Sequence, residues 1–150
     1  MRGIRYPGLI SYKAPAGGGT TDYAVEIFHE ALKSGHYDCF VREDTKLPMM
    51  YMDDAIRATL ELMDIPLEKL SGARGGYNIS GCSFTAGELV RSIQRHLPDF
   101  TCTFKPDIRQ TYADSWPDDI EDEVAKEEWA WYPKFNLDKM VDEMIINLQN

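Results

Sequence analysis

The sequence of 150 residues has the usual length of one globular domain, and its 43% hydrophobic content is sufficient for a buried core. Its 25 acidic and 16 basic residues give a net charge of -9, which disfavours binding to nucleic acid or anionic lipid. No apolar run reaches the roughly 20 residues of a membrane span, and the first residues resemble neither a signal peptide nor a transit peptide. We therefore expect neither nucleic acid nor a membrane as a partner.

The first third of the chain predicts a strand, a loop and a helix. A β-rich segment at 3–12 is interrupted by the turn residues Pro7 and Gly8. After a glycine cluster, polar residues at 20–22 offer side-chain caps to an amphipathic helix, which is predicted to end at Gly35. Short strands are expected next, at 39–41 and 49–52.

The rest of the chain alternates helices and strands. Asp53 and Asp54 are predicted to cap a helix whose apolar face carries Ile56, Leu60 and Met63. Further elements are expected as a strand at 77–80, a helix opened by the capping box Thr85 and Glu88, a strand at 100–104 and a helix capped by Asn136. This pattern predicts an α/β or α+β fold, with too few strands for a complete doubly wound sheet.

Cysteines and histidines offer no metal site. Cys39, Cys82 and Cys102 are odd in number and far apart, which favours reduced thiols that act as small buried hydrophobes. The three histidines share no ligand spacing, so no structural metal is predicted.

Four segments carry a resemblance to a known family. They are the Arg-Tyr-Pro-Gly stretch at 5–11, the Gly-Gly-Gly-Thr-Thr-Asp-Tyr-Ala loop at 17–24, the strand and helix start at 47–59, and the Ser-Trp-Pro turn at 113–117. In this order they resemble the second half of the extended short-chain dehydrogenase/reductases, and within these the L-threonine 3-dehydrogenases of the NAD-dependent epimerase/dehydratase-like family. The resemblance implies one unit, 1–150, formed by the C-terminal part of a Rossmann-like fold: the last strands of the parallel sheet plus a small α/β substrate-binding region. The dinucleotide-binding N-terminal half is then expected to lie outside these residues.

The same resemblance implies a cofactor segment. Residues beside the nicotinamide of NAD would be Tyr6, Pro7, Gly8, Leu9 and Ile10. Proline fixes a loop, glycine permits close approach of the backbone, and apolar neighbours exclude water from hydride transfer. A buried strand with an ordinary turn is the alternative interpretation.

Substrate residues follow from the resemblance as well. Thr20 or Thr21 would donate a hydroxyl to the carboxylate of L-threonine, at a helix start whose N–H groups favour an anion. Trp116 would pack against the methyl group of the substrate. The alternatives are that residues 20–22 only cap the helix and that Trp116 only buries area. Arg57 is a weaker candidate for the pocket wall.

Several departures from the family bear on catalysis. No tyrosine has a lysine four residues later, and no glycine-rich dinucleotide fingerprint is present, so we assign no catalytic residue. Ala130 stands where the family has glycine and would be strained at positive φ, and Glu123 stands where a serine is usual. The acidic residues between 118 and 128 are interpreted as a solvated face.

The leading hypothesis is a portion of an L-threonine 3-dehydrogenase, with NAD as cofactor and L-threonine as substrate. A sugar-nucleotide epimerase or dehydratase fragment is the first alternative, and an inactive product that pairs with a full-length subunit is the second. A chain without its other half is expected to leave Ile4, Leu9 and Ile10 uncovered and to associate. By resemblance, the full-length enzyme is a homodimer, mitochondrial in an animal and cytoplasmic otherwise.

Overall fold

The computed structural model describes residues 2–70 and 76–150. In chain order its strands are β1 Ile4–Arg5, β2 Gly8–Ile10, β3 His36–Cys39, β4 Lys46–Tyr51, β5 Tyr77–Asn78, β6 Cys82–Thr85 and β7 Thr101–Phe104. Its α-helices are α1 Tyr23–Ser34, α2 Met52–Asp64, α3 Ala86–Gln94, α4 Ile108–Asp114, α5 Glu123–Trp129 and α6 Leu137–Gln149, and one 3₁₀ turn spans Leu67–Lys69.

The strands form three small sheets in which parallel pairing dominates. β1 pairs with β5, β2 with β4 and β3 with β7, all parallel, while β6 joins the other edge of β4 in antiparallel orientation. β4 is buried at five successive positions, as expected of a strand covered on both faces. The architecture is α/β, which confirms the fold class predicted from the sequence.

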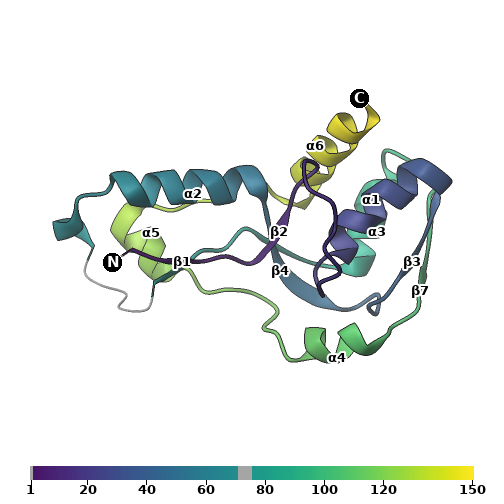
Figure 1. Cartoon of the computed structure of the whole chain (residues 1–150), viewed down its shortest axis with the longest axis horizontal. Helices are drawn as coiled ribbons and strands as arrows, with labels where there is room; N and C mark the ends of the chain where they lie inside the picture. The colour runs from purple at the N-terminus through teal and green to yellow at the C-terminus, as the bar shows by residue number, and fades with distance from the viewer. Residues whose placement is uncertain (1, 71–75) are drawn as a thin grey trace.

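Two apolar cores divide the molecule into a large lobe and a small lobe. The large lobe is built on α1, α3, α6, β3 and β7, and its fully buried side chains include Phe28, Leu89, Ile93, Val141 and Met144. The small lobe holds α2, α5, β1 and β5 around Leu62, Ile79 and Trp131. Figure 1 shows the small lobe at the opposite end of the elongated molecule from α1 and α3.

β2 and β4 lie between the two lobes. Successive residues of a strand point to opposite faces, so Met49 and Tyr51 enter the large core while Met50 enters the small one. In β2, Ile10 is completely buried in the large core and Leu9 packs against the small one. The expectation that Ile10 is left uncovered is therefore wrong.

Helix ends follow the sequence signals in three places. Gly35 ends α1 in the left-handed conformation, with φ 73°. Thr85 and Glu88 form the reciprocal capping box of α3, at 3.1 Å and 2.7 Å. Asn136 caps α6 by accepting from the backbone N–H of Lys139.

α2 differs from its prediction in both its cap and its buried face. Neither Asp53 nor Asp54 caps it, because the N-cap position is Tyr51 and no side chain bonds there. The buried side chains are Asp54, Ala55, Ala58 and Leu62. The predicted apolar face instead lies in solvent, where Ile56, Leu60 and Met63 are 52%, 56% and 64% exposed.

Other differences concern short elements. β6 and α4 have no counterpart in the prediction, and β3 begins at His36, three residues before the expected strand. Trp116 consequently lies just after a helix, α4. In the described ranges, no helix is long and apolar enough to cross a membrane.

Candidate functional site

The predicted cofactor segment is a parallel strand at the edge of its sheet. In β2, Gly8, Leu9 and Ile10 pair with Met49, Met50 and Tyr51 of β4. Within the described part of the chain, β4 is the only strand that pairs with β2. The backbone N–H and C=O groups on the other edge of β2 therefore pair with no described strand. That edge offers hydrogen-bonding groups to a ligand or to another strand.

Side chains of this segment mostly turn toward the protein. The Tyr6 hydroxyl is hydrogen-bonded to Thr59 of α2, and Pro7 is buried. Ile10 belongs to the large core and Leu9 packs against the small one. The structure therefore offers mainly the backbone of this segment for contact with a ligand.

Gly8 and the glycine-threonine loop lie in direct contact. A Cβ atom added to Gly8 would lie 2.8 Å from Cγ2 of Thr21 and 2.7 Å from Sδ of Met49. Glycine is thus required at this position because the side chains of Thr21 and Met49 fill the space. The structure brings together two segments that the sequence analysis had treated separately.

The loop before α1 is closed by a side chain that the sequence analysis took for a helix cap. Oδ2 of Asp22 accepts hydrogen bonds from the backbone N–H of Gly17 at 2.8 Å and of Gly19 at 2.6 Å. No side chain caps α1, and the capping interpretation of residues 20–22 is therefore wrong. The available signal was an aspartate shortly after glycines, since such carboxylates often bind nearby backbone N–H groups.

The hydroxyls of Thr20 and Thr21 are available to a ligand. Both residues are half-buried, and no hydrogen bond joins either hydroxyl to the residues that the structure describes. They sit at the start of a 12-residue helix, where the helix dipole favours negative charge. This pair combines partial burial with unused donors beside the Gly8 strand.

Trp116 lies in a different hollow. It follows α4, is 43% exposed, and lines a hollow of about 140 Å³ together with Arg42, Lys46 and Asp118. Neither Thr20 nor Thr21 lines this hollow. The structure thus brings Gly8 and Thr21 into contact and shows Trp116 in a hollow that neither threonine lines.

Tyr51 is the residue of β4 that pairs with Ile10 of the predicted cofactor segment. It is buried, and burial raises the pKa of its phenol above the ordinary value. Among residues 2–70 and 76–150, no three His, Cys, Asp or Glu side chains are grouped to hold a metal ion. The arrangement is suited to binding and exclusion of water.

Comparisons with known proteins show which proteins this chain resembles. No family model matches the chain. The mitochondrial L-threonine 3-dehydrogenase of Bos taurus is 49% identical over 146 residues, which cover 97% of this chain and 39% of the bovine protein. The solved structure of a GalE-like L-threonine dehydrogenase from Cupriavidus necator is 54% identical, with a TM-score of 0.95, covering 98% of this chain and 53% of that one. Over nearly its whole length, the chain is therefore similar to one part of the L-threonine 3-dehydrogenases.

The chain spans about two fifths to half the length of the threonine dehydrogenases that it matches. A nucleoside-diphosphate-sugar epimerase from Agrobacterium tumefaciens shares the fold at a TM-score of 0.81 but only 18% identity. The sequence similarity therefore separates the threonine dehydrogenases from this sugar-nucleotide enzyme, although the fold includes both.

Arg57 has a structural role in this chain. Its guanidinium binds Asp54 at 3.0 Å and Glu61 at 2.7 Å, and it stacks on the ring of Trp131. Asp54 in turn accepts hydrogen bonds from the backbone N–H groups of Lys134 and Phe135, all at 3.0 Å. This network joins α2 to the segment before α6, so the two terminal nitrogens of the Arg57 guanidinium are engaged within the chain.

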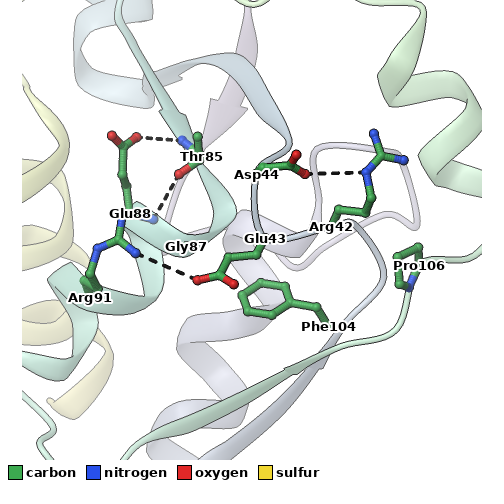
Figure 2. A pocket seen from close by; sticks show the side chains of 9 residues that line it. All are labelled: Arg42, Glu43, Asp44, Thr85, Gly87, Glu88, Arg91, Phe104 and Pro106. Carbon is green, nitrogen blue, oxygen red and sulfur yellow. Dashed lines mark hydrogen bonds and ion pairs between the residues drawn. The ribbon is translucent and has the colours of Figure 1, made fainter.

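A larger hollow, of about 650 Å³, lies between α3 and the segments around Arg42 and Phe104. Its charged groups are paired with one another (Figure 2): Arg91 faces Glu43 at 3.9 Å, and Arg42 faces Asp44 at 3.4 Å. Glu88 is engaged in the capping box. With these charges paired and Glu88 occupied, this hollow is a weaker site than the Gly8–Thr21 region.

Two departures from the family sequence have a visible structural setting. Ala130 ends α5 in the left-handed conformation, with φ 57° and ψ 38°, as the family's glycine predicts. The acidic stretch is only partly a solvated face, because Asp122 is buried and binds Lys126 at 2.8 Å as well as Ser80. Glu123 occupies the first turn of α5, where the helix dipole favours an acidic side chain.

Proposed function

We propose that this chain forms part of an NAD-dependent L-threonine 3-dehydrogenase, in which it supplies the substrate-binding wall and one side of the nicotinamide site. The enzyme oxidises the β-hydroxyl of L-threonine to give 2-amino-3-oxobutanoate. The carrying observation is the 54% identity to a threonine dehydrogenase structure at a TM-score of 0.95, against 18% for the sugar-nucleotide epimerase.

The Gly8–Thr21 contact supports the proposed placement of the substrate. Because no residue in the described part of the chain bonds to their hydroxyls, Thr20 and Thr21 are free to donate hydrogen bonds to the carboxylate of the substrate. The α1 dipole favours the same negative charge. Because Thr21 touches Gly8, a substrate held here lies beside β2. Trp116 stays proposed as the residue that packs against the methyl group of the substrate, although the hollow that it lines in this chain includes neither threonine.

NAD supplies the hydride acceptor of this reaction. The segment from Tyr6 to Ile10 fits a lining role, because it presents an open strand edge flanked by apolar residues. It does not fit binding of the whole cofactor, since the glycine-rich fingerprint for the pyrophosphate is absent from the sequence. This chain's residues therefore exclude water and orient the nicotinamide side.

A second polypeptide segment completes the enzyme in this proposal. It carries the tyrosine and lysine that move the proton and the loop that binds the pyrophosphate. The small lobe offers this second segment a surface, because the exposed residues Ile56, Leu60 and Met63 form an apolar stripe along α2. By the same resemblance the complete enzyme is a homodimer and, in an animal, mitochondrial, as the bovine relative's name states for that protein.

The test joins this chain to the portion of the Cupriavidus necator enzyme that it does not match. We expect L-threonine to drive NADH formation by the joined protein, while the 150-residue chain alone produces none. A Thr20→Val, Thr21→Val double substitution removes both hydroxyls at nearly constant volume and is expected to raise the KM for L-threonine.

Three outcomes decide against the proposal. A joined protein that folds, binds NAD and ignores L-threonine would overturn it. Binding of a UDP-sugar by that protein would favour the epimerase alternative. A folded joined protein without either activity would favour an inactive pairing partner.

A further inference from the structure

A single carboxylate oxygen holds the glycine loop in shape. Oδ2 of Asp22 takes both hydrogen bonds from the loop, 2.8 Å from the nitrogen of Gly17 and 2.6 Å from that of Gly19. The backbone N–H of Asp22 also donates to the carbonyl of Gly19 at 3.1 Å. Hydrogen bonds to an ionised acceptor are stronger than neutral ones. Residues 17–22 are therefore one closed turn.

This carboxylate is not needed to start α1. The first N–H groups of the helix, those of Ala24, Val25 and Glu26, donate to the backbone carbonyls of Thr21 and Asp22. No side-chain cap bond is present. Removing the carboxylate therefore leaves the supports of the helix start in place and changes the loop alone.

Without that carboxylate the loop would be loose. Three consecutive glycines have more conformational freedom than any other tripeptide. Of the three glycines at 17–19, only Gly18 has a positive φ, of 92°. Thr20 and Thr21 follow the glycines directly, so their hydroxyl positions depend on the closed turn. A loose loop would have to be ordered by each substrate molecule that binds.

We infer that Asp22 is a positioning residue, which locks the glycine loop so that the Thr20 and Thr21 hydroxyls form a prepared pair for the substrate carboxylate. This inference rests on the proposed function. Asp22 contributes by accepting the two loop hydrogen bonds and not by its charge. Its negative charge by itself would repel the substrate carboxylate. Both loop bonds end on one oxygen, and an amide offers one carbonyl oxygen in the same place.

The experiment compares Asp22→Ala with Asp22→Asn in the joined enzyme. We expect Asp22→Ala to raise the KM for L-threonine roughly tenfold and leave kcat within about twofold, as for an interaction that contributes equally to ground state and transition state. Asp22→Asn keeps the acceptor, loses the repulsion, and is expected to have a KM equal to or below that of the parent. Asp99→Ala removes the same charge at an exposed turn and is expected to change neither constant.

Hydrogen exchange supplies a second readout in the 150-residue chain. The amides of Gly17 and Gly19 are expected to exchange faster in Asp22→Ala than in the parent or in Asp22→Asn. An unchanged KM in Asp22→Ala, or a fall in kcat alone, would overturn the inference while the proposed function stands. A parent enzyme that does not oxidise L-threonine would overturn the proposed function, and with it the substrate role of the loop.

Discussion

The two lobes of the molecule differ in how far their helices bury their apolar side chains. Helices α1, α3 and α6 of the large lobe bury their apolar faces against one another and against the sheet. In the small lobe, α2 buries Ala55, Ala58 and Leu62 and turns its larger side chains Ile56, Leu60 and Met63 to solvent. The large lobe covers its apolar faces within the described residues, whereas α2 of the small lobe leaves an apolar stripe exposed. We propose that this stripe is an interaction surface.

The sharpest test of this comparison is the same substitution in both lobes. Leu89 in α3 is completely buried, whereas Leu60 in α2 is 56% exposed. Leu89→Ala is expected to lower the free energy of unfolding by about 2–5 kcal/mol through lost burial and a cavity. Leu60→Ala is expected to change it by less than about 0.5 kcal/mol.

Urea denaturation of both variants measures the difference, and because both residues are helical leucines, helix propensity cancels. Equal losses in the two variants would show that α2 is covered in solution by a second copy of the chain or by a rearrangement.

The connection between the lobes depends on Asp54. Its removal in Asp54→Ala leaves Arg57 without one partner and two backbone N–H groups without acceptors. We expect a loss of about 3 kcal/mol in the free energy of unfolding, because buried polar groups lose their hydrogen bonds. Asp54→Asn keeps one acceptor oxygen and is expected to lose less. A thermal melt in which Asp54→Ala matches the parent would contradict this role.

The small lobe also carries an acid-sensitive contact. Burial disfavours the charge of Asp122, but the Lys126 ammonium and the Ser80 hydroxyl outweigh it and lower the pKa of this carboxyl. A lowered pKa in the folded state gives stability that is present above the unfolded pKa of roughly 3.9 and is lost as pH falls through the folded pKa.

Stability of the parent is therefore expected to decline below about pH 4 more steeply than that of Asp122→Asn. Parallel curves of unfolding free energy against pH would show that the Asp122 contact contributes no acid sensitivity.

A smaller effect is expected at the end of α5. Ala130 has a φ of 57°, which costs a side chain on the order of 1–2 kcal/mol that glycine avoids. Glycine also makes the unfolded chain more flexible, which returns up to about 1 kcal/mol. We expect Ala130→Gly to stabilise the protein by roughly 0.5 kcal/mol, seen as a slightly higher Tm. A lower Tm would show that the strain at this position is relieved by other contacts.

The smallest change in stability, with the clearest change in association, is expected for Leu60→Lys. The side chain is exposed, so the free energy of unfolding stays within about 0.5 kcal/mol of the parent. Self-association of the 150-residue chain is expected to weaken, because a charge interrupts the apolar stripe. Sedimentation measures this association. An unchanged association would place the interaction surface elsewhere.

Much of the fold follows from local sequence signals. Gly35, the Thr85 and Glu88 pair, and Asn136 define helix ends through hydrogen bonds between near neighbours in the chain. The positive φ of Ala130 followed from a family pattern and is present in the structure. Such features need no knowledge of distant residues.

The elements that sequence reasoning missed are short or depend on distant contacts. β6 is defined by its pairing with β4, from Lys46 to Met49, and α4 has only seven residues. The roles of Asp22 and Asp54 were misassigned for a related reason. Each precedes or begins a helix, which favours a cap, but its carboxylate binds backbone groups outside the helix.

The sequence by itself determined the resemblance to L-threonine 3-dehydrogenases, the α/β class and the segments proposed to carry a binding site, because these depend on residue order and local spacing. Only the tertiary structure decided which face of α2 is buried, since a helix with apolar residues on several sides can be covered on any of them. It also decided that Thr21 meets Gly8 and that Trp116 lines a small hollow with Arg42 and Lys46. Contacts between segments that are far apart in the sequence depend on how the chain folds in three dimensions. The spacing of residues along the chain does not specify which of these segments meet.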